Sequence, residues 1–522
     1  MKLKLFVILL LFTFGVWSVN AQITFQKTYG GTGNEEGHSV QQTVDGGYIF
    51  TGFTTSFGAG NFDYYLIKTN EYGDTMWTKS YGGANWDYGF SVKQTSDSGY
   101  IIAGHSDNFS SGLYTAHIIK TNSTGDTLWT KTFGGSNPNG ASSYSVQQTT
   151  DGGYIITGDT PLGAGDVSLI KMDSTGNHLW TKAYGGANSY DIAYSVQQTT
   201  DEGYILSGYT NSFGAGYYDV YLIKTDSIGD TLWTKTYGSS SAEIGWCVQQ
   251  TADGGYIISG GDSLGHAYII KTTSSGDTLW TKDYDSGKVV KSINQTSDGG
   301  FIFAGTASGF GLGNKDLYLL KTDVNGNVSW TTSFGGAGYD EGFSVQQTLD
   351  GGYIVGGYTT TFGAGGSDFW LIKTDASGNN GCNLSSSPTI TIAPQIIVGN
   401  PPTILTSGGT ETTISTVIAQ GGAVINTQCT NVGVDELFKT ENLFSAYPNP
   451  FTNEIKIKSN ENGVLSIMTG KIILLDVIGK EILRQNISSF ETILNTEKIS
   501  AGFYLLNYIN GNKSANTKLM KR

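Results

Sequence analysis

The sequence predicts an all-β protein: a seven-bladed β-propeller of four-stranded blades, followed by a β-rich linker and a small C-terminal β-sandwich. Three observations lead to this fold class. A unit of about 51 residues occurs seven times, each unit divides into four short strand-like segments, and a segment missing from the last unit precedes the first. Sustained repeats of roughly 40–50 residues are typical of propellers and solenoids.

Each unit contains an Asp-Gly-Gly-Tyr turn or a close variant, with its Asp at positions 45, 97, 151, 201, 253, 298 and 350. In the fourth unit the four segments are Ser195–Thr199, Tyr204–Thr210, Tyr221–Thr225 and Thr231–Tyr237. These segments are rich in β-branched and aromatic residues and are bounded by Gly and Asp, which indicates strands in antiparallel hairpins. Four such strands make one propeller blade.

The two ends of the repeat indicate a closed ring. The last unit has three segments, from Ser344 to Thr374, and Cys382 stands where other units have a Trp. The first unit is preceded by an additional fourth segment, Phe25–Gly31. Pairing this segment into the last blade leaves no open edge, whereas an open solenoid would need polar caps that the sequence lacks. The predicted propeller spans residues 22–381.

Most recurring residues have structural explanations. Trp and Tyr fill space between blades, Gly pairs permit positive φ, and the turn Asp accepts backbone N–H groups. A lysine recurs in the third segment of every unit, at positions 68, 120, 171, 224, 271, 321 and 373. These lysines could form an anion-binding ring, but we expect their stems to cover apolar surface and their heads to meet carboxylates.

Functional residues of a repeat protein are expected where the repeat varies, in the loops of one rim. The connectors between the fourth strand and the next blade carry acids and aromatic residues: Glu35, Trp86, Asp87, Tyr190, Asp191, Glu243, Tyr339 and Asp340. Aromatic rings stack on sugar faces and carboxylates accept sugar hydroxyls, so these residues are candidates for a glycan-binding rim. The alternative, that each acid caps its own loop, stays open.

Composition and motifs argue against several other functions. The formal charge is −14, which disfavours nucleic acid or anionic lipid as the main partner. The five histidines share no metal-ligand spacing, and no nucleophile elbow, P-loop or zinc-protease motif occurs. We therefore expect no metal, no cofactor and no catalysis. A carbohydrate-active enzyme using adjacent acids such as Asp340 and Glu341 is an alternative.

The N-terminus predicts export. Lys2 and Lys4 precede an apolar run from Leu5 to Val16, and small residues lead to a cleavage site after Ala21. This pattern is typical of a secretory signal peptide (residues 1–21), too short to span a membrane, and no later segment is apolar enough to do so.

Three cysteines remain in the exported chain. Cys382 and Cys429 bracket a Thr-, Ser- and Pro-containing stretch, residues 382–434, which predicts a β-rich linker, either a stalk or an edge extension, closed by a disulfide. Cys247 replaces the Ser found at this position of the other units, so we expect a small buried thiol and not a nucleophile.

The last part of the chain, residues 435–522, resembles a known family. Its motifs are Tyr447-Pro-Asn-Pro-Phe, then Ile472 to Glu481, Ile499 to Leu506 and Leu519 to Arg522, in this order. They are similar to the C-terminal sorting domain of type IX secretion substrates. The resemblance implies a compact β-sandwich, recognised by the type IX secretion machinery of a Bacteroidetes-type cell, and a final location on the outer cell surface or in the medium.

Together these features predict an exported, non-catalytic binding or adhesion module whose propeller rim takes a glycan or a protein. A structural surface component without a small ligand is the alternative.

Overall fold

The structure is a computed structural model in which every regular element is a β-strand. It describes residues 22–108, 114–134, 140–160, 165–186, 190–263, 265–308, 313–380, 384–385, 391–392, 397–399, 404–407, 411–413, 417–420, 424–432, 444–447, 451–459, 468–476, 480–489, 491–510 and 513–521. The predicted signal peptide lies outside these residues. In the described ranges no helix is long and apolar enough to cross a membrane.

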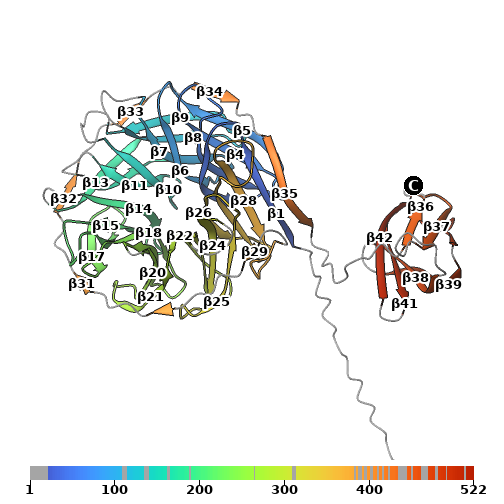
Figure 1. Cartoon of the computed structure of the whole chain (residues 1–522). Helices are drawn as coiled ribbons and strands as arrows, with labels where there is room; N and C mark the ends of the chain where they lie inside the picture. Colours follow the sequence, from blue (N-terminus) through green and yellow to red (C-terminus); the bar gives the residue numbers. More distant parts are fainter. Residues whose placement is uncertain are drawn as a thin grey trace, which may run out of the picture. The chain divides into compact units, whose positions relative to one another are not determined.

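The repeats fold as seven antiparallel blades arranged in a ring (Figure 1), as predicted. Blade 1 contains β2 (Glu35–Gln42), β3 (Tyr48–Thr54), β4 (Asp63–Thr69) and β5 (Thr75–Gly82). Blade 2 contains β6 (Asp87–Gln94), β7 (Tyr100–Ser106), β8 (Thr115–Thr121) and β9 (Thr127–Phe133). Blade 3 contains β10 (Ser142–Gln148), β11 (Tyr154–Thr160), β12 (Asp166–Met172) and β13 (His178–Gly185). Blade 4 contains β14 (Asp191–Gln198), β15 (Tyr204–Thr210), β16 (Asp219–Thr225) and β17 (Thr231–Gly238). Blade 5 contains β18 (Glu243–Gln250), β19 (Tyr256–Asp262), β20 (His266–Thr272) and β21 (Thr278–Ser286). Blade 6 contains β22 (Lys288–Gln295), β23 (Phe301–Ser308), β24 (Lys315–Thr322) and β25 (Val328–Phe334).

Blade 7 closes the ring as the sequence predicts. It contains β26 (Asp340–Gln347), β27 (Tyr353–Thr359), β28 (Asp368–Thr374) and the N-terminal strand β1 (Ile23–Gly30). β1 pairs antiparallel with β28 over five residues, from Phe25 opposite Lys373 to Tyr29 opposite Phe369. Pairing strands from the two ends of the repeat removes the open edge that a linear array would keep.

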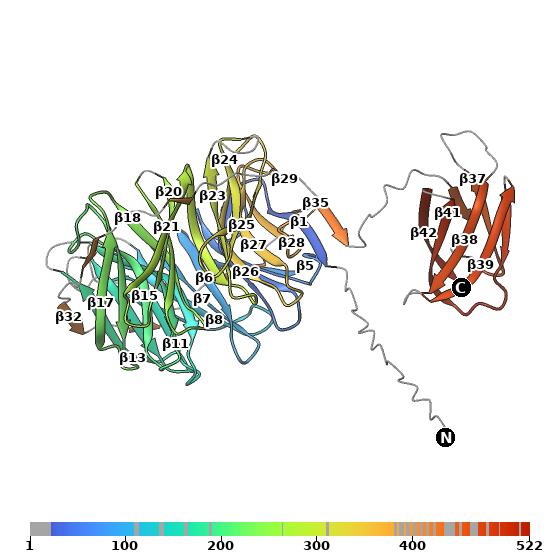
Figure 2. The ribbon, with the colours of Figure 1, turned by 90° about the horizontal axis from the view of Figure 1, so that it is seen from below.

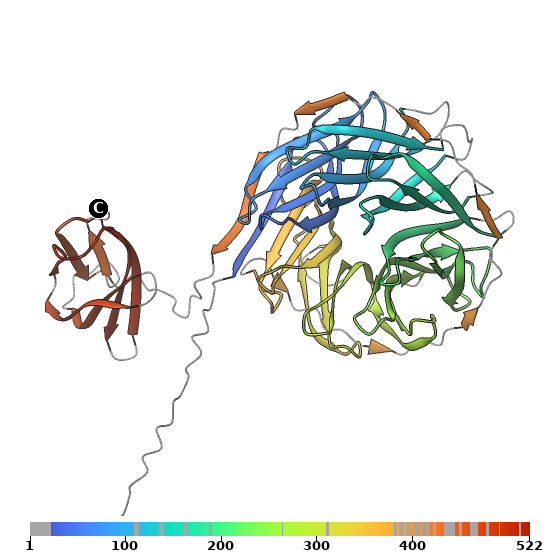
Figure 3. The ribbon, with the colours of Figure 1, turned by 180° about the vertical axis from the view of Figure 1, so that it is seen from behind.

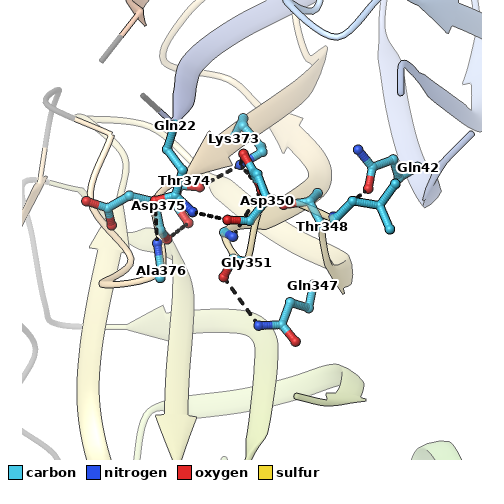
Figure 4. A network of polar contacts seen from close by, with 12 residues as sticks. Gln22, Gln42, Gln347, Thr348, Asp350, Gly351, Lys373, Thr374, Asp375 and Ala376 are labelled. Carbon is cyan, nitrogen blue, oxygen red and sulfur yellow. Dashed lines mark hydrogen bonds and ion pairs between the residues drawn. The ribbon is translucent and has the colours of Figure 1, made fainter. Parts of the chain in front are cut away.

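Polar side chains reinforce this junction (Figure 4). Gln22 Nε2 donates to the Asp350 carbonyl at 2.7 Å, and Gln22 Oε1 accepts from the Ala376 amide at 3.2 Å. Across the seam, the Leu349 amide donates to Gln42 Oε1 of blade 1 at 2.9 Å. The first described residue and the first blade are therefore both bonded to blade 7.

The stretch between the propeller and the C-terminal unit forms a fifth strand on every blade. Its described strands are β29 (Leu384–Ser385), β30 (Thr391–Ile392), β31 (Ile397–Gly399), β32 (Ile404–Ser407), β33 (Glu411–Thr413), β34 (Val417–Gln420) and β35 (Val424–Val432). In chain order they pair with β25, β21, β17, β13, β9, β5 and β1, the outermost strands of blades 6, 5, 4, 3, 2, 1 and 7. Figures 1 and 3 show these short strands around the outside of the ring.

This peripheral segment (residues 384–432) is β-rich, and its described strands cover the outer edges of the blades. Of the two predicted alternatives, the described strands therefore form the edge extension and not the stalk. The physical reason is that the last strand of each blade has a row of unpaired backbone N–H and C=O groups, which an added strand satisfies. Cys429 lies in β35 opposite Gln26, whereas Cys382 is outside the described residues. The Cys382–Cys429 disulfide and the domain boundaries stay predictions.

Adjacent blades are joined by the recurring Trp, Tyr and Gly. The turn between the third and fourth strands has a Gly with positive φ, and it packs on the Trp of the preceding blade. A Cβ on Gly125 would lie 2.8 Å from the Trp77 ring, so only Gly allows this approach. The Tyr81 hydroxyl donates to the Gly125 carbonyl at 2.6 Å. The same Tyr-to-Gly bond joins Tyr29 to Gly73, Tyr184 to Gly229, Tyr237 to Gly276 and Tyr284 to Gly326.

The seven recurring lysines meet carboxylates, as expected. Each is almost completely buried, and its Nζ lies 2.8–2.9 Å from the Asp of the Asp-Gly-Gly turn of its own blade. Lys68, for example, contacts Asp45 and also donates to the Thr69 carbonyl at 2.8 Å. These lysines stabilise turns and do not line a common site.

The C-terminal unit is a separate β-sandwich, as predicted from its motifs. One sheet contains β36 (Phe444–Tyr447), β37 (Glu454–Ser459) and β40 (Glu491–Asn495). The other contains β39 (Glu481–Ser489), β38 (Met468–Asp476), β41 (Gly502–Asn510) and β42 (Lys513–Lys521), seen side by side in Figure 2. Its core includes Phe451, Ile455, Ile472, Leu506 and Leu519, all almost fully buried.

Candidate functional site

The five acids of the predicted rim are enclosed by protein. Glu35, Asp87, Asp191, Glu243 and Asp340 begin the innermost strands of their blades, and none is more than 4% exposed. Each accepts a hydrogen bond from its own connector, and all but Glu243 also accept one from the loop that follows the second strand of their blade. Asp191 Oδ2, for example, accepts from the Gly186 amide at 3.0 Å and from Ser212 Oγ at 2.6 Å.

The bond from the acid's own connector recurs at the other four positions. The Gly31, Gly83, Ser239 and Gly336 amides donate to Glu35, Asp87, Glu243 and Asp340 at 2.8–3.1 Å. These contacts agree with the alternative in which each acid caps its own loop. Their burial favours this alternative, and contact between these carboxylates and a ligand stays a prediction.

Each rim acid has a second carboxylate beside it, at the start of the third strand of the preceding blade. The partners are Asp368 for Glu35, Asp63 for Asp87, Asp166 for Asp191, Asp219 for Glu243 and Asp316 for Asp340, and each pair lies over the Gly at the end of the fourth strand. A Cβ on Gly82 would be 2.1 Å from Asp63 Oδ1 and 2.7 Å from Asp87 Oδ2. This close packing explains why Gly recurs there.

Burial and mutual repulsion affect the acidity of these pairs. Desolvation raises the pKa of Asp87 to about 7, with a further contribution from the charge of Asp63. Desolvation and the neighbouring acids raise the pKa of Asp166, Asp316 and Asp368 to about 6. The rim therefore holds carboxyl groups that bind protons well above the usual range of aspartic acid.

The three aromatic residues of the predicted rim are exposed. Trp86 is 44% exposed, Tyr190 is 55% exposed and Tyr339 is 47% exposed. Each directly precedes a buried rim acid, and its backbone amide donates to a side chain of the loop beside it at 2.6–2.8 Å. The buried acids and these backbone bonds fix the loops on which the rings stand.

A second set of side chains lines the central channel and was missed by sequence reasoning. It comprises the residue immediately before the recurring Ser of each innermost strand: His38, Phe90, Tyr144, Tyr194, Trp246, Lys291 and Phe343. We call these seven residues the channel ring. Its aromatic members contact one another in sequence around the channel. Ring centroids are 4.8 Å apart for Phe343 and His38, 5.3 Å for His38 and Phe90, and 5.2 Å for Phe90 and Tyr144. Tyr144 and Tyr194 are 5.0 Å apart, and Tyr194 and Trp246 are 4.5 Å apart.

The variability of one position within the repeat could have indicated the channel ring. The channel ring position precedes the recurring Ser-Val-Gln-Gln segment, yet it carries five different residue types in seven copies. In all seven blades this residue lies where the ladder between the first two strands shifts register, between the flanking residues such as Gly37 and Ser39. A β-bulge changes the direction in which the side chain of the extra residue points. The regular alternation of side chains along a strand therefore did not predict where this side chain lies.

Lys291 is the charged member of the channel ring. Its Nζ lies 3.5 Å from the Phe343 ring centroid and 2.9 Å from Glu341 Oε2, and Glu341 Oε1 contacts Lys315 at 3.2 Å. These lysines lower the pKa of Glu341 despite its burial. Desolvation and the charge of Glu341 raise the pKa of nearby Glu36 to about 7. One side of the channel thus has an ionised and a readily protonated glutamate.

Cys247 substitutes for Ser in an inter-blade contact. In other blades the Ser Oγ accepts from the Val amide of the next blade, as between Ser39 and Val92 at 3.3 Å. Cys247 is partly buried, burial raises the pKa of its thiol, and it receives the Ile293 amide. A protonated thiol in this place is not an activated nucleophile.

One cluster among the described residues could hold a metal ion. The ligand atoms of Asp262, His266 and Asp283 all lie within 4.8 Å of one another. His266 Nδ1 is 2.9 Å from Asp262 Oδ2 and 3.0 Å from Asp283 Oδ2, which are hydrogen-bond distances.

Comparison with known proteins adds the decisive observation about the C-terminal unit. Residues 445–522 match the family described as the secretion system C-terminal sorting domain. This part of the chain is a type IX secretion sorting domain. It implies recognition by the type IX secretion machinery and a location on the cell surface or outside the cell, as the sequence predicted. A search of curated proteins found no match for the chain.

Solved structures are only distantly similar. PorZ of Porphyromonas gingivalis, described as an essential bacterial surface component of the type IX secretion system, has 10% identity and a TM-score of 0.36. The alignment covers 91% of this chain and 58% of PorZ, so the chain spans less than two thirds of that protein. Sqt1 of Chaetomium thermophilum has 9% identity and a TM-score of 0.38, over 65% of this chain and 82% of its own. A putative exo-β-1,3-galactanase of Bifidobacterium bifidum has 12% identity and a TM-score of 0.27, over 47% of this chain and 89% of its own.

Proposed function

We propose that the protein is an exported, non-catalytic binding module that attaches the cell surface, or its immediate surroundings, to a glycan. The leader (residues 1–21, cleaved after Ala21) directs passage across the inner membrane, and the sorting domain directs passage across the outer membrane. The propeller then presents its rim to the outside. The ligand contacts are made by Trp86, Tyr190 and Tyr339.

The observation that carries this proposal is the exposure of three aromatic rings on loops that are fixed by buried carboxylates. Aromatic rings of this kind offer flat apolar surface to the faces of sugar rings. Because the loops are held by hydrogen bonds, little conformational entropy is lost when a ligand binds. The buried acids act as positioning residues in this proposal, and the ligand does not touch them.

The test is a triple substitution of Trp86, Tyr190 and Tyr339 by Ala, probed on a glycan array with the secreted full-length protein. We expect binding to the best glycan to weaken by about tenfold or more, because each ring removes a stacking contact.

The matched control replaces Leu128, Leu232 and Leu279, which are equally exposed, by Ala, and should leave binding unchanged. Equal binding of the triple aromatic variant would contradict the proposal. An absence of any glycan binding by the wild-type protein would favour the alternative of a structural surface component.

A second candidate, a carbohydrate-active enzyme, is favoured by one observation. Glu36 has its pKa raised to about 7, while Glu341 has its pKa lowered, and charge interaction links the two groups. Environments that separate the acidity of two neighbouring carboxyl groups are typical of general acid and base pairs. Glu36→Gln should abolish polysaccharide turnover if this candidate is correct. The absence of turnover in the wild-type protein would reject it.

A further inference from the structure

The innermost strands carry a second ring of side chains. It comprises the first Gln of each Ser-Val-Gln-Gln segment or its replacement: Gln41, Lys93, Gln147, Gln197, Gln249, Asn294 and Gln346. We call these residues the amide ring. All but one end in a carboxamide, and all except Lys93 receive the same hydrogen bond. Their side-chain oxygen accepts from the backbone amide of the second Gln in the next blade, at 2.6–3.1 Å.

These bonds fix which end of each carboxamide can still bind a ligand. A backbone N–H can only donate, so the atom that receives it is Oε1 (Oδ1 in Asn294). The NH2 group is then the free end. Among the described residues, no protein acceptor contacts the NH2 groups of these six residues. The amide ring therefore offers hydrogen-bond donors to whatever occupies the channel beside it.

Lys93 breaks the ring in a way that adds positive charge. An ammonium group cannot accept a hydrogen bond, so the Gln148 amide lacks the acceptor that Gln41 gives to Gln94. No carboxylate forms an ion pair with Lys93 within the described part of the chain. Lys93 is partly buried, and burial lowers its pKa. A desolvated cation without a counterion is costly, and an anion beside it removes the cost.

The space next to these donors is large enough for a polyatomic ligand. The channel ring and the amide ring line one cavity of about 280 Å³, and its lining contains no Asp or Glu. A water molecule in the liquid occupies roughly 30 Å³, and a single-atom ion is of similar size. The cavity therefore has room for a ligand several times larger than such an ion. Lys291, the other lysine of the lining, is already neutralised by Glu341 at 2.9 Å. The lining thus contains donors and one uncompensated cation.

We propose that this cavity binds a small oxyanion, held by the Lys93 ammonium and by NH2 groups of the amide ring. Several oxygen atoms allow one ligand to accept from Lys93 and from amides of other blades at the same time, which a single-atom anion does not. Inorganic oxyanions and the carboxylates of small organic acids share this chemistry. The site uses residues other than the three exposed rings of the rim, and it stands independently of glycan binding.

The test is calorimetric titration of the full-length exported protein with sodium sulfate, phosphate, acetate or chloride at constant ionic strength. We expect saturable binding of at least one oxyanion and weaker binding of chloride. The oxyanion that binds most tightly shows whether the site selects inorganic oxyanions or the carboxylates of organic acids. Lys93→Gln should weaken oxyanion binding roughly tenfold to a hundredfold, because it removes a charge-assisted hydrogen bond. This variant introduces the residue that five other blades carry, so it should fold, with a melting temperature equal to or above that of the wild type.

The matched control is Lys79→Gln, which removes the same charge from a lysine that pairs with Asp126 at 3.1 Å between blades 1 and 2. It should leave oxyanion binding unchanged. Equal affinity of wild type and Lys93→Gln would overturn the assignment to Lys93. Binding of chloride as tight as that of every oxyanion, or no saturable binding at all, would overturn the oxyanion site.

Discussion

The hydroxyl group of Tyr81 provides a sensitive test of how the blades are joined. It is buried, and it donates to the Gly125 carbonyl of the next blade at 2.6 Å. Tyr81→Phe removes this bond and keeps the aromatic ring, so no cavity forms. Phe133 and Phe334 occupy the same position in blades 2 and 6, which shows that a ring without the hydroxyl fits the fold.

The expected cost follows from the buried acceptor left behind. A neutral hydrogen bond contributes about 1 kcal/mol net, and a carbonyl left unsatisfied in the interior costs about 1–3 kcal/mol. We therefore expect Tyr81→Phe to lower the free energy of unfolding by about 1–3 kcal/mol. The measurement is urea denaturation followed by tryptophan fluorescence, with the slope compared between variants so that a change in midpoint reports stability.

Tyr72→Phe is the matched control, since Tyr72 is 39% exposed and its hydroxyl makes no hydrogen bond among the described residues. It should change the free energy of unfolding by less than about 0.5 kcal/mol. The reasoning would be refuted if Tyr81→Phe were no more destabilising than Tyr72→Phe. In that case the recurring Tyr would contribute through its ring alone.

Three further predictions concern acidity, packing and sorting. Because the pKa of Asp87 is about 7 and that of Asp166, Asp316 and Asp368 about 6, the folded state binds protons that the unfolded chain has released. The contribution of these carboxyl groups to the free energy of unfolding should therefore rise as pH falls from 8 to about 5, while burial of His38, His105 and His117, which lowers their pKa to about 3–4, contributes with the opposite sign. Asp87→Asn isolates the carboxyl contribution: between pH 8 and pH 5 it should gain less stability, or lose more, than the wild type in urea denaturation series, and an identical pH dependence would contradict this. Gly82→Ala should destabilise by about 1–3 kcal/mol or more, because the new Cβ would lie 2.1 Å from Asp63 Oδ1; an unchanged urea midpoint would show that the carboxylates can move apart. Deletion of residues 435–522 should retain the protein in the periplasm, measured by cell fractionation and by protection from added protease, and surface exposure of the truncated protein would contradict its role in sorting.

Much of the fold could be predicted because each repeat contains the residues that its own turns and packing contacts require. The Asp-Gly-Gly turn, the Gly of the outer turn and the Trp of the fourth strand recur at fixed spacing, and each satisfies a local requirement of hairpin or blade packing. Ring closure followed from counting strands, since Phe25–Gly31 supplied the one that the last unit lacks. Local chemistry was sufficient for these features.

For the peripheral segment the sequence left a stalk and an edge extension open, and its strands could not be assigned to particular blades. Its strands contain two to nine residues and share no repeat, and their partners are edges that exist only after the blades have formed. It also runs around the ring in the reverse order of the blades, which no local pattern encodes. For the rim acids the sequence left two roles open, ligand contact and loop capping, because it does not show whether a connector side chain is buried. The structure buries all five, which favours capping.

This contrast suggests where to look for function in a ring of near-identical blades. A residue that recurs in all copies, such as the turn Asp or its lysine, is explained by a contact that every blade must make. Lys93 and Lys291 instead depart from positions that are otherwise carboxamide or mainly aromatic. Each places a charge in the channel where the ring's own contacts do not require one. Lys291 has an internal partner in Glu341, whereas Lys93 has no carboxylate partner in the described structure. The unneutralised substitution is therefore the one that a ligand best explains.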